Sequence, residues 1–356
     1  MFLKKLNDAR WAKTWYARDN VHSANEYWNK AGVNSKEGTM KLEQLLEGLE
    51  YRCEAGNTER EVAAVVNDSR KLCKDCLFLC IVGANFDGHS KAMEAVEKGA
   101  AVLVVSRELP KEVLESGITV IRVEDTRYAM AFISAAWFGH PARKLTTIGI
   151  TGTKGKTTTT YLVKSILEHA GHKVGLVGTI EAIIGEKHIP AHNTTPESYM
   201  LQDYFAQMVD AGCDTVVMEV SSQGLMLHRT QGFTFDYGIF TNLEPDHIGP
   251  NEHASMEEYI ACKGLLFKQC KVGIANLDSE YLWQVMEGHT CKLETYGIGR
   301  DGASTPDLWA SDLQLTHRPG SLGVAFHVNG LLNMDVEIAT PGRFSVYNAL
   351  TAIAIC

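Results

Sequence analysis

The sequence Thr-Gly-Thr-Lys-Gly-Lys-Thr-Thr-Thr-Thr at residues 151–160 follows an apolar run at 145–150 and opens an amphipathic segment. This order predicts a β-strand, a loop and an α-helix. Gly152 and Gly155 allow the loop backbone to curl so that its N–H groups face inward, and the helix N-terminus adds a positive potential. Two residues separate these glycines. The common phosphate-binding loop has four residues between its first glycine and the Gly-Lys pair.

The side chains after the second glycine indicate what the loop binds. Lys156 supplies a positive charge for the β- and γ-phosphates of a nucleotide, and the hydroxyl of Thr157 suits a Mg²⁺ ion that bridges them. A Gly-Lys-Thr triplet alone could be an ordinary turn. Because a strand is expected before it and a helix after it, the stretch favours a nucleotide-binding site.

Composition limits the class of protein. A chain of 356 residues with 45% hydrophobic content is too long for one compact core, so two domains are expected. The net charge of −9 argues against binding to nucleic acid. The nine cysteines have no regular spacing, which is typical of a reducing compartment. No apolar run reaches the roughly 18 residues that span a membrane, and no signal-peptide core is seen, so a cytoplasmic protein without membrane contact is expected.

Cys73, Cys76 and Cys80 include a Cys-x-x-Cys pair, which is half of a common zinc site. No second pair of cysteine or histidine follows at ligand spacing. Cys76 and Cys80 also flank the apolar run 77–79, where a buried cysteine acts as a small hydrophobic residue. Burial in a strand is therefore the favoured interpretation.

The hydrophobic pattern divides the chain into three parts. Residues 1–39 are charged, show no clear period and stay unassigned. A first domain is expected at 40–143, with leucines on one helical face at its start (Leu42, Leu45, Leu46 and Leu49). Its strands are expected at 77–82, 101–105 and 119–123, and its helices at 90–98 and 126–138, the second capped by Asp125.

The second domain, at 144–356, alternates strands and helices. Strands are expected at 145–150, 174–177, 215–220, 237–241 and 272–275, and helices at 157–169, 196–211 and 256–269. Pro196 suits the first turn of its helix, and Ser255 with Glu258 forms a capping-box pattern. The alternation predicts an α/β fold with a mostly parallel sheet that is covered by helices on both faces. Antiparallel strands at 312–339 and a helix at 344–356 follow.

Polar residues follow the ends of the predicted parallel strands, where open α/β sheets bind ligands. Glu219 ends an apolar strand, where a carboxylate is costly unless it is hydrogen-bonded or binds a cation. A surface position at the strand end is the simple alternative. Beside a phosphate loop, a Mg²⁺ ligand is the better hypothesis. Asn242 and the pair Asp246-His247 follow the next strand.

Lys263 lies in the predicted helix 256–269, four residues after Tyr259 and four before Phe267, so its stem follows an apolar stripe. Its ammonium could extend to water, which is the commoner arrangement. Alternatively, its neutral amine takes up CO₂ and forms a carbamate, whose oxygens can approach Mg²⁺. Spacing alone leaves both interpretations open.

Several motifs occur together and in one order. They are Gly152-Thr-Lys-Gly-Lys-Thr-Thr158, Asn193-Thr-Thr-Pro196, Met218-Glu-Val-Ser-Ser222 with Arg229, Thr241-Asn-Leu243 with Asp246-His247, and Tyr259-x-x-x-Lys263-x-x-Leu-Phe267. In this combination the chain, from about residue 40 to its end, resembles the Mur ligases, which are ATP-dependent amino-acid ligases of peptidoglycan precursor synthesis. Asn193-Thr-Thr-Pro196 and Glu219-Val-Ser-Ser222 resemble the members that extend UDP-N-acetylmuramoyl-L-alanyl-D-glutamate by its third residue. Asp68-Ser-Arg70 resembles part of their uridine-binding domain.

The resemblance implies a role for each matching residue. ATP would contact Gly152, Thr153, Lys154, Gly155, Lys156, Thr157, Thr158 and, at its adenine, Asn276. Thr157 and Glu219 would hold Mg²⁺, and His247 with a carbamylated Lys263 would hold a second ion, so that Lys156, Lys263 and His247 act in catalysis. The uridine nucleotide would contact Ser69, Ala84, Asn85 and Phe86. The muramoyl-dipeptide would contact Asn193, Thr194, Thr195, Ser221 and Arg229.

The implied reaction is phosphorylation of the D-glutamyl side-chain carboxylate, followed by attack of a diamino acid, meso-diaminopimelate or L-lysine, on the acyl phosphate. The family's third domain, of about 150 residues, holds the amino-acid pocket and would begin where this chain ends, so a truncated ligase is expected. Leu227 and Ser345 stand where the family often has Gln and Asn. A monomer is expected.

Two alternatives remain open. One is another enzyme with the same central domain, such as a folylpolyglutamate synthase or a cyanophycin-type ligase. The other is a non-catalytic module that binds ATP or the UDP-muramoyl-dipeptide and joins nothing. Binding of the nucleotide sugar separates the first from the main hypothesis, and turnover of ATP separates the second.

Overall fold

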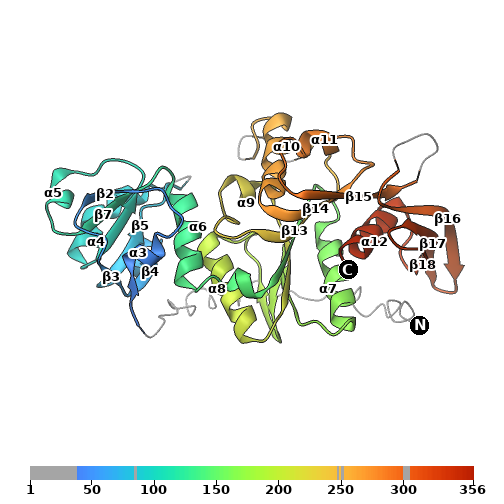
Figure 1. The fold of residues 1–356 in the computed structure, drawn as a ribbon, viewed down its shortest axis with the longest axis horizontal. Coiled ribbons are helices and arrows are strands. Elements are labelled where there is room, and N and C mark those ends of the chain that lie inside the picture. Colours follow the sequence, from blue (N-terminus) through green and yellow to red (C-terminus); the bar gives the residue numbers. More distant parts are fainter. Residues whose placement is uncertain (1–37, 84–85, 247, 250–251, 300–304) are drawn as a thin grey trace.

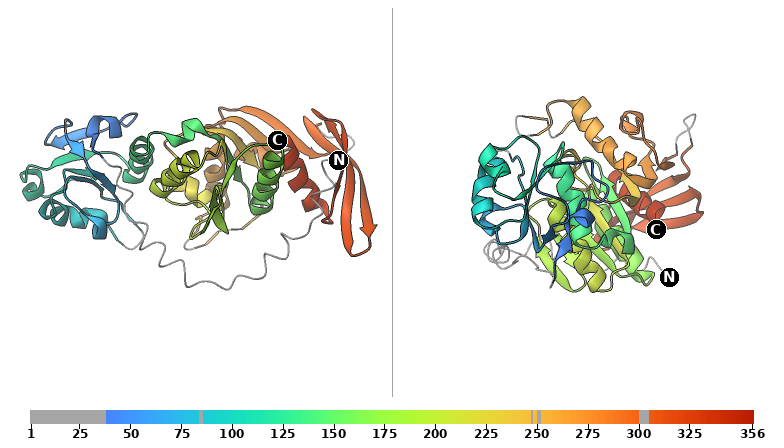
Figure 2. Two further views of the ribbon diagram at one scale, coloured as in Figure 1. Left: turned by 90° about the horizontal axis from the view of Figure 1, so that it is seen from below. Right: turned by 60° about the vertical axis from the view of Figure 1, so that its left-hand side comes forward.

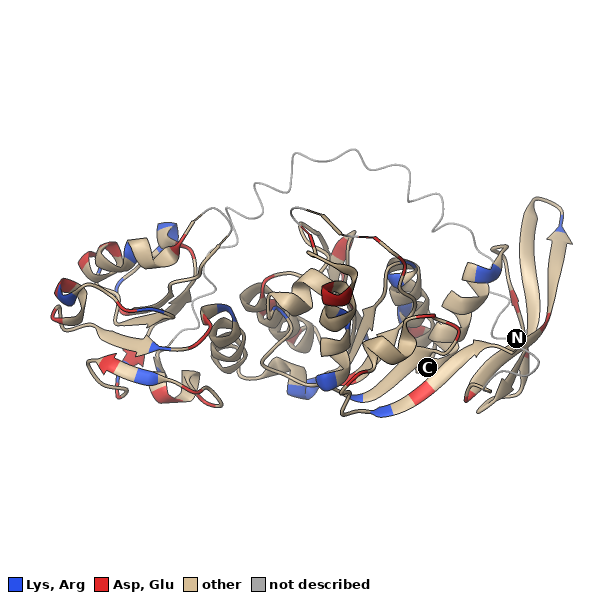
Figure 3. Cartoon of the chain, turned by 90° about the horizontal axis from the view of Figure 1, so that it is seen from above, with Lys and Arg blue, Asp and Glu red and all other residues tan. Residues whose placement is uncertain are grey.

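The computed structural model describes residues 38–83, 86–246, 248–249, 252–299 and 305–356. Ala84, Asn85 and His247 lie outside the described residues, as does most of the unassigned segment 1–39. Two large sheets with their helices follow one another along the long axis of the molecule, and the strands near the C-terminus lie at the far end from the first sheet (Figures 1 and 2). Basic and acidic residues are interspersed over both parts (Figure 3).

The first part is built on a five-stranded sheet. Its order is β2 (Arg52–Ala55), β7 (Thr119–Arg122), β6 (Val102–Val105), β5 (Cys76–Leu79) and β4 (Ala64–Val66), with all neighbours parallel except β2 and β7. β1 (Met40–Lys41) and β3 (Glu61–Val62) form a separate antiparallel pair. The helices are α3 (Leu42–Leu45), α4 (Ala92–Glu97), α5 (Lys111–Leu114) and α6 (Thr126–Trp137). Asp125 caps α6 by accepting hydrogen bonds from the backbone N–H groups of Arg127 and Tyr128, as expected.

The second part contains an eleven-stranded sheet. In spatial order its strands are β11 (Lys187–Pro190), β10 (Glu181–Ile184), β9 (Val174–Val177), β12 (Thr215–Glu219), β8 (Thr146–Thr151), β13 (Phe235–Phe240), β14 (Cys270–Asn276), β15 (Lys292–Ile298), β16 (Leu308–Arg318), β17 (Ser321–Gly330) and β18 (Met334–Ile338). The strands from β9 to β16 pair in parallel. At one edge β11 pairs antiparallel with β10 and β10 with β9, and at the other edge β18 pairs antiparallel with β17 and β17 with β16. The α/β fold with a mostly parallel sheet is confirmed.

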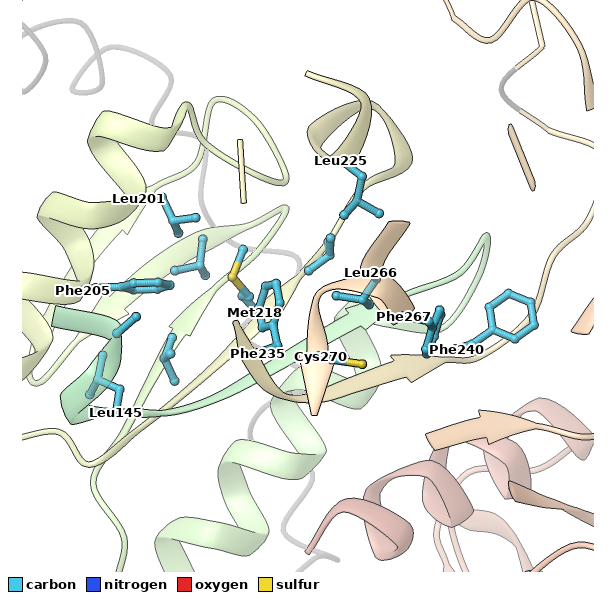
Figure 4. Packing of buried hydrophobic residues seen from close by; sticks show 14 of the residues in the cluster. Leu145, Leu201, Phe205, Met218, Leu225, Phe235, Phe240, Leu266, Phe267 and Cys270 are labelled. Carbon is cyan, nitrogen blue, oxygen red and sulfur yellow. The ribbon is translucent and has the colours of Figure 1, made fainter. Parts of the chain in front are cut away.

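Helices cover both faces of this sheet. On one face, α8 (Ser198–Asp210), α10 (Met256–Gly264) and α11 (Leu282–Val285) pack on a core that includes Phe205, Met218, Phe235 and Phe267 (Figure 4). On the other face, α7 (Lys156–His169) and α12 (Arg343–Ile355) pack on the opposite side chains of the same strands. The short α9 (Ser222–Met226) follows β12. Within the described ranges, every helix is too short or too polar to cross a lipid bilayer.

Most expected elements are present, but several ends differ. The strand expected at 77–82 ends at Leu79, where the N–H of Ile81 donates to the Leu79 carbonyl and the chain turns. A 3₁₀-helix, η3 (Gly88–Lys91), precedes α4 in place of one continuous helix at 90–98. The leucine-rich helix at the start of the first part ends at Leu45.

Two helices of the second part also differ from the prediction. α8 begins at Ser198 with Glu197 at its N-cap, so Pro196 precedes the helix and is not in its first turn. α10 ends at Gly264 and continues as the 3₁₀-helix η5 (Leu265–Lys268). Ser255 caps α10 as expected, but the Glu258 carboxylate accepts from the Ala254 N–H, one residue before the position of a capping box.

Candidate active site

The glycine-rich loop lies between β8 and α7, at the carboxyl end of β8, which is flanked by β12 and β13 inside the parallel part of the sheet. Gly152 and Gly155 both have positive φ angles, +151° and +86°. A Cβ atom would lie 2.0 Å from the Thr241 hydroxyl at the first position, and 2.5 Å from the Asn348 side-chain oxygen at the second. Both positions therefore require glycine, because other loop and helix atoms approach the backbone too closely for a side chain.

The next strand end holds this loop in place. The Asn242 carbonyl accepts a hydrogen bond from the Thr153 N–H at 2.9 Å. Its side-chain oxygen accepts from the Lys154 N–H at 2.9 Å, and its side-chain nitrogen donates to the Lys154 carbonyl at 3.0 Å. Thr241 donates to the same carbonyl at 2.9 Å. The loop is thus pre-organised by Thr241 and Asn242, which the sequence placed at this edge of the sheet.

Lys156 begins α7 and folds back over the loop. Its ammonium donates to the carbonyls of Gly152 and Thr153, at 2.8 and 3.2 Å. Burial lowers the pKa of Lys156, and the nearby carboxylates of Glu219 and Asp246 act in the opposite direction. A phosphate oxygen could replace the loop carbonyls as the partner of this ammonium.

Glu219 is 1% exposed at the end of β12 and lies beside the start of α7. Thr157 donates to both carboxylate oxygens, each at 3.0 Å. Thr179 donates through its N–H at 2.9 Å and its hydroxyl at 3.1 Å. The surface alternative for Glu219 is therefore wrong. A buried carboxylate beside a threonine hydroxyl presents the hard oxygen ligands that Mg²⁺ prefers, so these residues fit a magnesium ion.

Lys263 is 2% exposed, so the alternative in which its ammonium extends to water is wrong. Its nitrogen lies 4.4 Å from the centre of the Tyr259 ring. Burial, and then the charge of Lys156, hold the pKa of Lys263 well below its ordinary value. Both causes favour the neutral amine, which is the form that reacts with CO₂.

Tyr259 connects α10 to the glycine-rich loop. Its hydroxyl lies 3.1 Å from the hydroxyl oxygen of Thr153, which also accepts from the Glu244 N–H at 3.0 Å. Because Lys263 packs on the same ring, Tyr259 contacts both the glycine-rich loop and this lysine. The sequence marked Tyr259 only as part of a motif and gave no signal for the contact with Thr153.

One cavity of about 510 Å³ brings part of the expected site together, whereas Thr157 and Glu219 do not line it. Its walls include loop residues, side chains of the Asn193 motif, the start of α9 and α10 (Gly152, Lys156, Thr179, Asn193, Thr194, Ser221, Arg229, His253, Tyr259 and Lys263). Ser69 and Phe86 do not line it. They lie at the carboxyl edge of the first sheet, Ser69 in a 3₁₀ turn after β4 and Phe86, which is 51% exposed, after β5.

Thr195 was expected to contact the muramoyl-dipeptide, but its side chain is completely buried. Its hydroxyl donates to the Glu219 carbonyl at 3.0 Å and accepts from the Ser221 N–H at 2.9 Å. We therefore assign this side chain a structural role between two loops. Ser221, which caps α9 and lines the cavity, remains available for a ligand.

Asn276 was expected near adenine. It is 5% exposed, and its amide nitrogen donates to the Thr241 carbonyl at 2.8 Å. Its amide oxygen accepts from the Asp278 N–H at 3.0 Å. Both ends of the Asn276 amide thus hydrogen-bond to neighbouring backbone groups. The contact of Asn276 with adenine stays a prediction.

The cysteine interpretation is confirmed for its two buried members. Cys76 lies in β5 and Cys80 directly follows it, and both are fully buried free thiols. Burial raises the pKa of Cys76 to about 11 and that of Cys80 to about 12. Cys73 is exposed.

Several site residues were missed by the sequence prediction. Thr179, which binds Glu219, follows β9 as part of Gly178-Thr179, and a small polar pair at a strand end was the available signal. Asn348 comes from α12, nearly two hundred residues from the loop it touches, and no local pattern pointed to it. His253, whose Nε2 lies 2.7 Å from the Ser222 hydroxyl, lacked a motif.

The family description "Mur ligase middle domain" matches residues 150–356, which is more than half of the chain, and "Mur ligase family, catalytic domain" matches residues 61–138. A phosphate-binding loop at the carboxyl edge of a parallel sheet, next to a carboxylate and a buried lysine, agrees with these matches. The chain belongs to the Mur ligase family.

Curated relatives give the particular branch to which the chain is similar. It is 42% identical over 317 residues to UDP-N-acetylmuramoyl-L-alanyl-D-glutamate–2,6-diaminopimelate ligase 1 of Clostridium acetobutylicum, covering 89% of this chain and 63% of the relative. It is 43% identical to the enzyme of that name from Caldanaerobacter subterraneus subsp. tengcongensis, with coverage of 89% and 63%. The chain thus spans about 63% of the length of these relatives.

Solved structures support the fold. A UDP-N-acetylmuramoyl-L-alanyl-D-glutamate–2,6-diaminopimelate ligase superposes with a TM-score of 0.75 at 22% identity, over 89% of this chain and 63% of that one. MurF from Acinetobacter baumannii superposes with a TM-score of 0.57 at 18% identity, over 89% and 64%. At these identities the likeness concerns the fold alone.

Proposed function

We propose that the protein is an ATP-dependent ligase that adds diaminopimelate to UDP-N-acetylmuramoyl-L-alanyl-D-glutamate in peptidoglycan precursor synthesis. The observation that carries this proposal is the single cavity that joins the phosphate loop to Asn193, Ser221 and Arg229. The choice of diaminopimelate over L-lysine rests on the names of relatives that are about 42% identical. The 356 residues supply the sites for ATP and for the nucleotide sugar peptide, and ligation is proposed for the whole protein.

ATP binding begins with the loop. The inward N–H groups of the loop and the N-terminus of α7 bind the phosphates, and Lys156 leaves the carbonyls of Gly152 and Thr153 for phosphate oxygens. This ammonium stabilises negative charge on the transferred phosphoryl group. Because Thr241 and Asn242 already fix the loop, little reorganisation is needed when ATP binds.

Mg²⁺ would be held by Thr157 and Glu219, and it would lower the repulsion between ATP and the substrate carboxylate. In its buried position the Glu219 carboxylate accepts hydrogen bonds from the Thr157 hydroxyl and the Thr179 N–H. The Thr157 hydroxyl, which now donates to Glu219, would turn a lone pair toward the ion. His247 would contribute to a second ion together with Lys263.

Lys263 would act as its carbamate. Its nitrogen lone pair attacks CO₂, a C–N bond forms, and one proton leaves to solvent, so that the side chain changes from a neutral amine to an anion. The resulting oxygens would face Lys156 across the cavity, and attraction to that ammonium would offset the cost of burying the new charge.

The substrate would place its D-glutamyl carboxylate near the γ-phosphate. Arg229 lines the cavity and can bind an anionic oxygen of the peptide, and Asn193 and Thr194 can hydrogen-bond its amides. The uridine end would reach the carboxyl edge of the first sheet, at Ser69 and Phe86. The carboxylate takes the phosphoryl group, ADP leaves, and attack by the diamino-acid amine on the acyl phosphate releases phosphate.

Two binding measurements test this proposal. Calorimetry of the 356-residue protein with Mg-ATP, and separately with UDP-N-acetylmuramoyl-L-alanyl-D-glutamate, should give one site for each ligand. Competition by UDP-N-acetylmuramic acid, but not by folate or a cyanophycin peptide, separates this function from the other ligases with the same central domain. Binding of ATP without any binding of the nucleotide sugar would contradict the proposed substrate.

A further inference from the structure

Glu197 lies between two arginines that come from different parts of the molecule. One carboxylate oxygen accepts from Arg127 of α6 at 3.1 Å, and the other accepts from the Nε–H of Arg229 at 3.1 Å. Nη2 of Arg229 also lies 2.8 Å from the second oxygen. The side chains of Arg127, Glu197 and Arg229 are 20%, 33% and 11% exposed, so the chain of charges is largely shielded from water.

Arg229 is held on a second side as well. Its Nη1 donates to the Thr195 carbonyl at 3.0 Å. Of the five N–H groups of a guanidinium, these contacts use the Nε–H and one N–H each of Nη1 and Nη2, which leaves one on Nη1 and one on Nη2 for a ligand in the cavity. A freely rotating arginine would lose about 2 kcal/mol of side-chain entropy when it binds an anion. Glu197 and Thr195 remove much of that freedom before the ligand arrives.

Arg127 belongs to the helix that connects the first sheet to the second. α6 packs on the first sheet through Ile133 and Trp137 and also contacts α8, whose N-cap residue is Glu197 (Figure 1). The first turn of α6 also touches the residue before Arg229. The Tyr128 ring meets the His228 ring edge-on at 5.5 Å, and Asp125 lies 3.8 Å from His228.

We propose that Glu197 is a positioning residue that fixes Arg229 for an anionic group of the muramoyl-dipeptide and ties it, through Arg127, to α6. These contacts thereby hold the uridine-binding and dipeptide-binding parts of the protein in a fixed position relative to each other. The inference rests on the proposed function for its ligand, but the contact itself can be tested without that ligand. Arg127 does not line the cavity, so any effect of changing it must pass through other residues.

Charge and position predict opposite results for Glu197→Gln. Removing a negative charge next to Arg229 makes the site more positive, which by itself would tighten binding of an anion. Releasing the guanidinium from its fixed orientation weakens binding. If Glu197 acts by positioning, the dissociation constant for UDP-N-acetylmuramoyl-L-alanyl-D-glutamate rises about tenfold or more. The dissociation constants for UDP alone and for Mg-ATP should stay unchanged.

The first experiment follows the Nε–H of Arg229 by ¹H–¹⁵N NMR of arginine-labelled protein, with the signal assigned by its loss in Arg229→Lys. Hydrogen exchange of this group should be slow in the wild type and faster in Glu197→Gln. Arg127→Gln should also speed it, although Arg127 reaches Arg229 through Glu197, because Glu197 then loses one of its two partners. Glu186→Gln, a change at an exposed glutamate between β10 and β11, is the matched control.

The second experiment measures affinity for the nucleotide sugar dipeptide in the same variants and in Arg127→Gln/Glu197→Gln. Under the proposal, Arg127→Gln as a single change weakens binding of the nucleotide sugar dipeptide several-fold. The same change has no further effect in a protein that already carries Glu197→Gln. Equal or tighter binding by Glu197→Gln, or additive effects of the two changes, would overturn it. If the wild type does not bind this ligand at all, the proposed function fails, whereas the NMR exchange rates still decide the positioning role. If Glu197→Gln does not fold, Arg127→Gln alone gives the same comparison.

Discussion

The hydroxyl of Thr157 donates to both carboxylate oxygens of Glu219, at 3.0 Å each, although 62 residues separate the two in the sequence. Parallel pairing of β12 with β8 produces this contact, because it sets Glu219 opposite Ile150 at the start of the loop. The contact gives a ready pair of oxygen ligands at the place where the nucleotide phosphates are expected. The predicted role of Glu219 as a Mg²⁺ ligand can therefore be tested by substitution.

Glu219→Gln should weaken the dependence of ATP affinity on Mg²⁺. An amide removes the negative charge, and its NH₂ group opposes the donors of Thr157 and Thr179. We expect the gain in ATP affinity on adding Mg²⁺ to fall about tenfold, which corresponds to ~1.4 kcal/mol. Calorimetry with and without Mg²⁺ measures it, with Glu186→Gln as the control. An unchanged Mg²⁺ effect would remove Glu219 from the metal site.

Lys156→Ala should lower the affinity for Mg-ATP by roughly 10- to 100-fold, because charged hydrogen bonds contribute about 1.5–3 kcal/mol. The fold should be retained, since in the described part of the chain the ammonium donates to the loop carbonyls of Gly152 and Thr153. Lys154→Ala is the matched control: it removes a lysine of the same loop whose side chain is 55% exposed. Equal losses in the two variants would show only a general effect of charge.

Gly155→Ala should lower both stability and ATP affinity. The residue has a φ angle of +86°, and an added Cβ would lie 2.5 Å from the Asn348 oxygen. The backbone strain alone costs about 1–3 kcal/mol. Gly155→Ala/Asn348→Ala removes the close contact but not the strain, so it should recover only part of the loss in a urea unfolding experiment. Full recovery would mean that φ is not strained at this position.

The order of strands and helices could be predicted because each has its own local pattern. The apolar run before Glu219 and the loop glycines placed two strand ends at one edge of the sheet, and the structure has them there. The antiparallel pair β10–β11 was missed, although Gly185, with a φ angle of +55°, marks the two-residue turn between the strands. The flanking residues mix charged and apolar types, so their alternation is weak. The burial of individual side chains could not be predicted. Lys263 and Thr195 both have sequence neighbours that allow exposure, and only tertiary packing buries them.

The carbamate at Lys263 is tested directly by ¹³C NMR. In bicarbonate labelled with ¹³C, the wild type should give a carbamate carbonyl signal that is absent in Lys263→Met. Lys268→Met, which removes an exposed lysine of the adjoining 3₁₀-helix, should leave the signal unchanged. Adding Mg-ATP should slow its exchange with bulk CO₂. No site-specific signal at any pH between 7 and 9 would contradict the carbamate and leave a buried neutral amine.

Lys263 also predicts how stability changes with pH in CO₂-free buffer. Burial holds its pKa in the folded state well below the ordinary value of 10.5, which applies in the unfolded chain. Below the folded pKa both states carry the charge, and the cost of burying it is fully present. Between the two pKa values the unfolded state binds more protons, so the free energy of unfolding rises with pH, by at most about 1.4 kcal/mol per pH unit.

Lys263→Met removes this titration and keeps a side chain of similar length. The free energy of unfolding of the wild type, minus that of Lys263→Met, should therefore increase from pH 6 to pH 9.5. The slope arises because the folded protein releases the lysine proton at a lower pH than the unfolded chain does. Urea denaturation at half-unit intervals of pH measures it, with Lys268→Met, at an exposed site, as the control that should give a flat difference. A flat or falling difference for Lys263→Met would show that Lys263 stays charged in the folded protein, and the carbamate would then lose the neutral amine from which it forms.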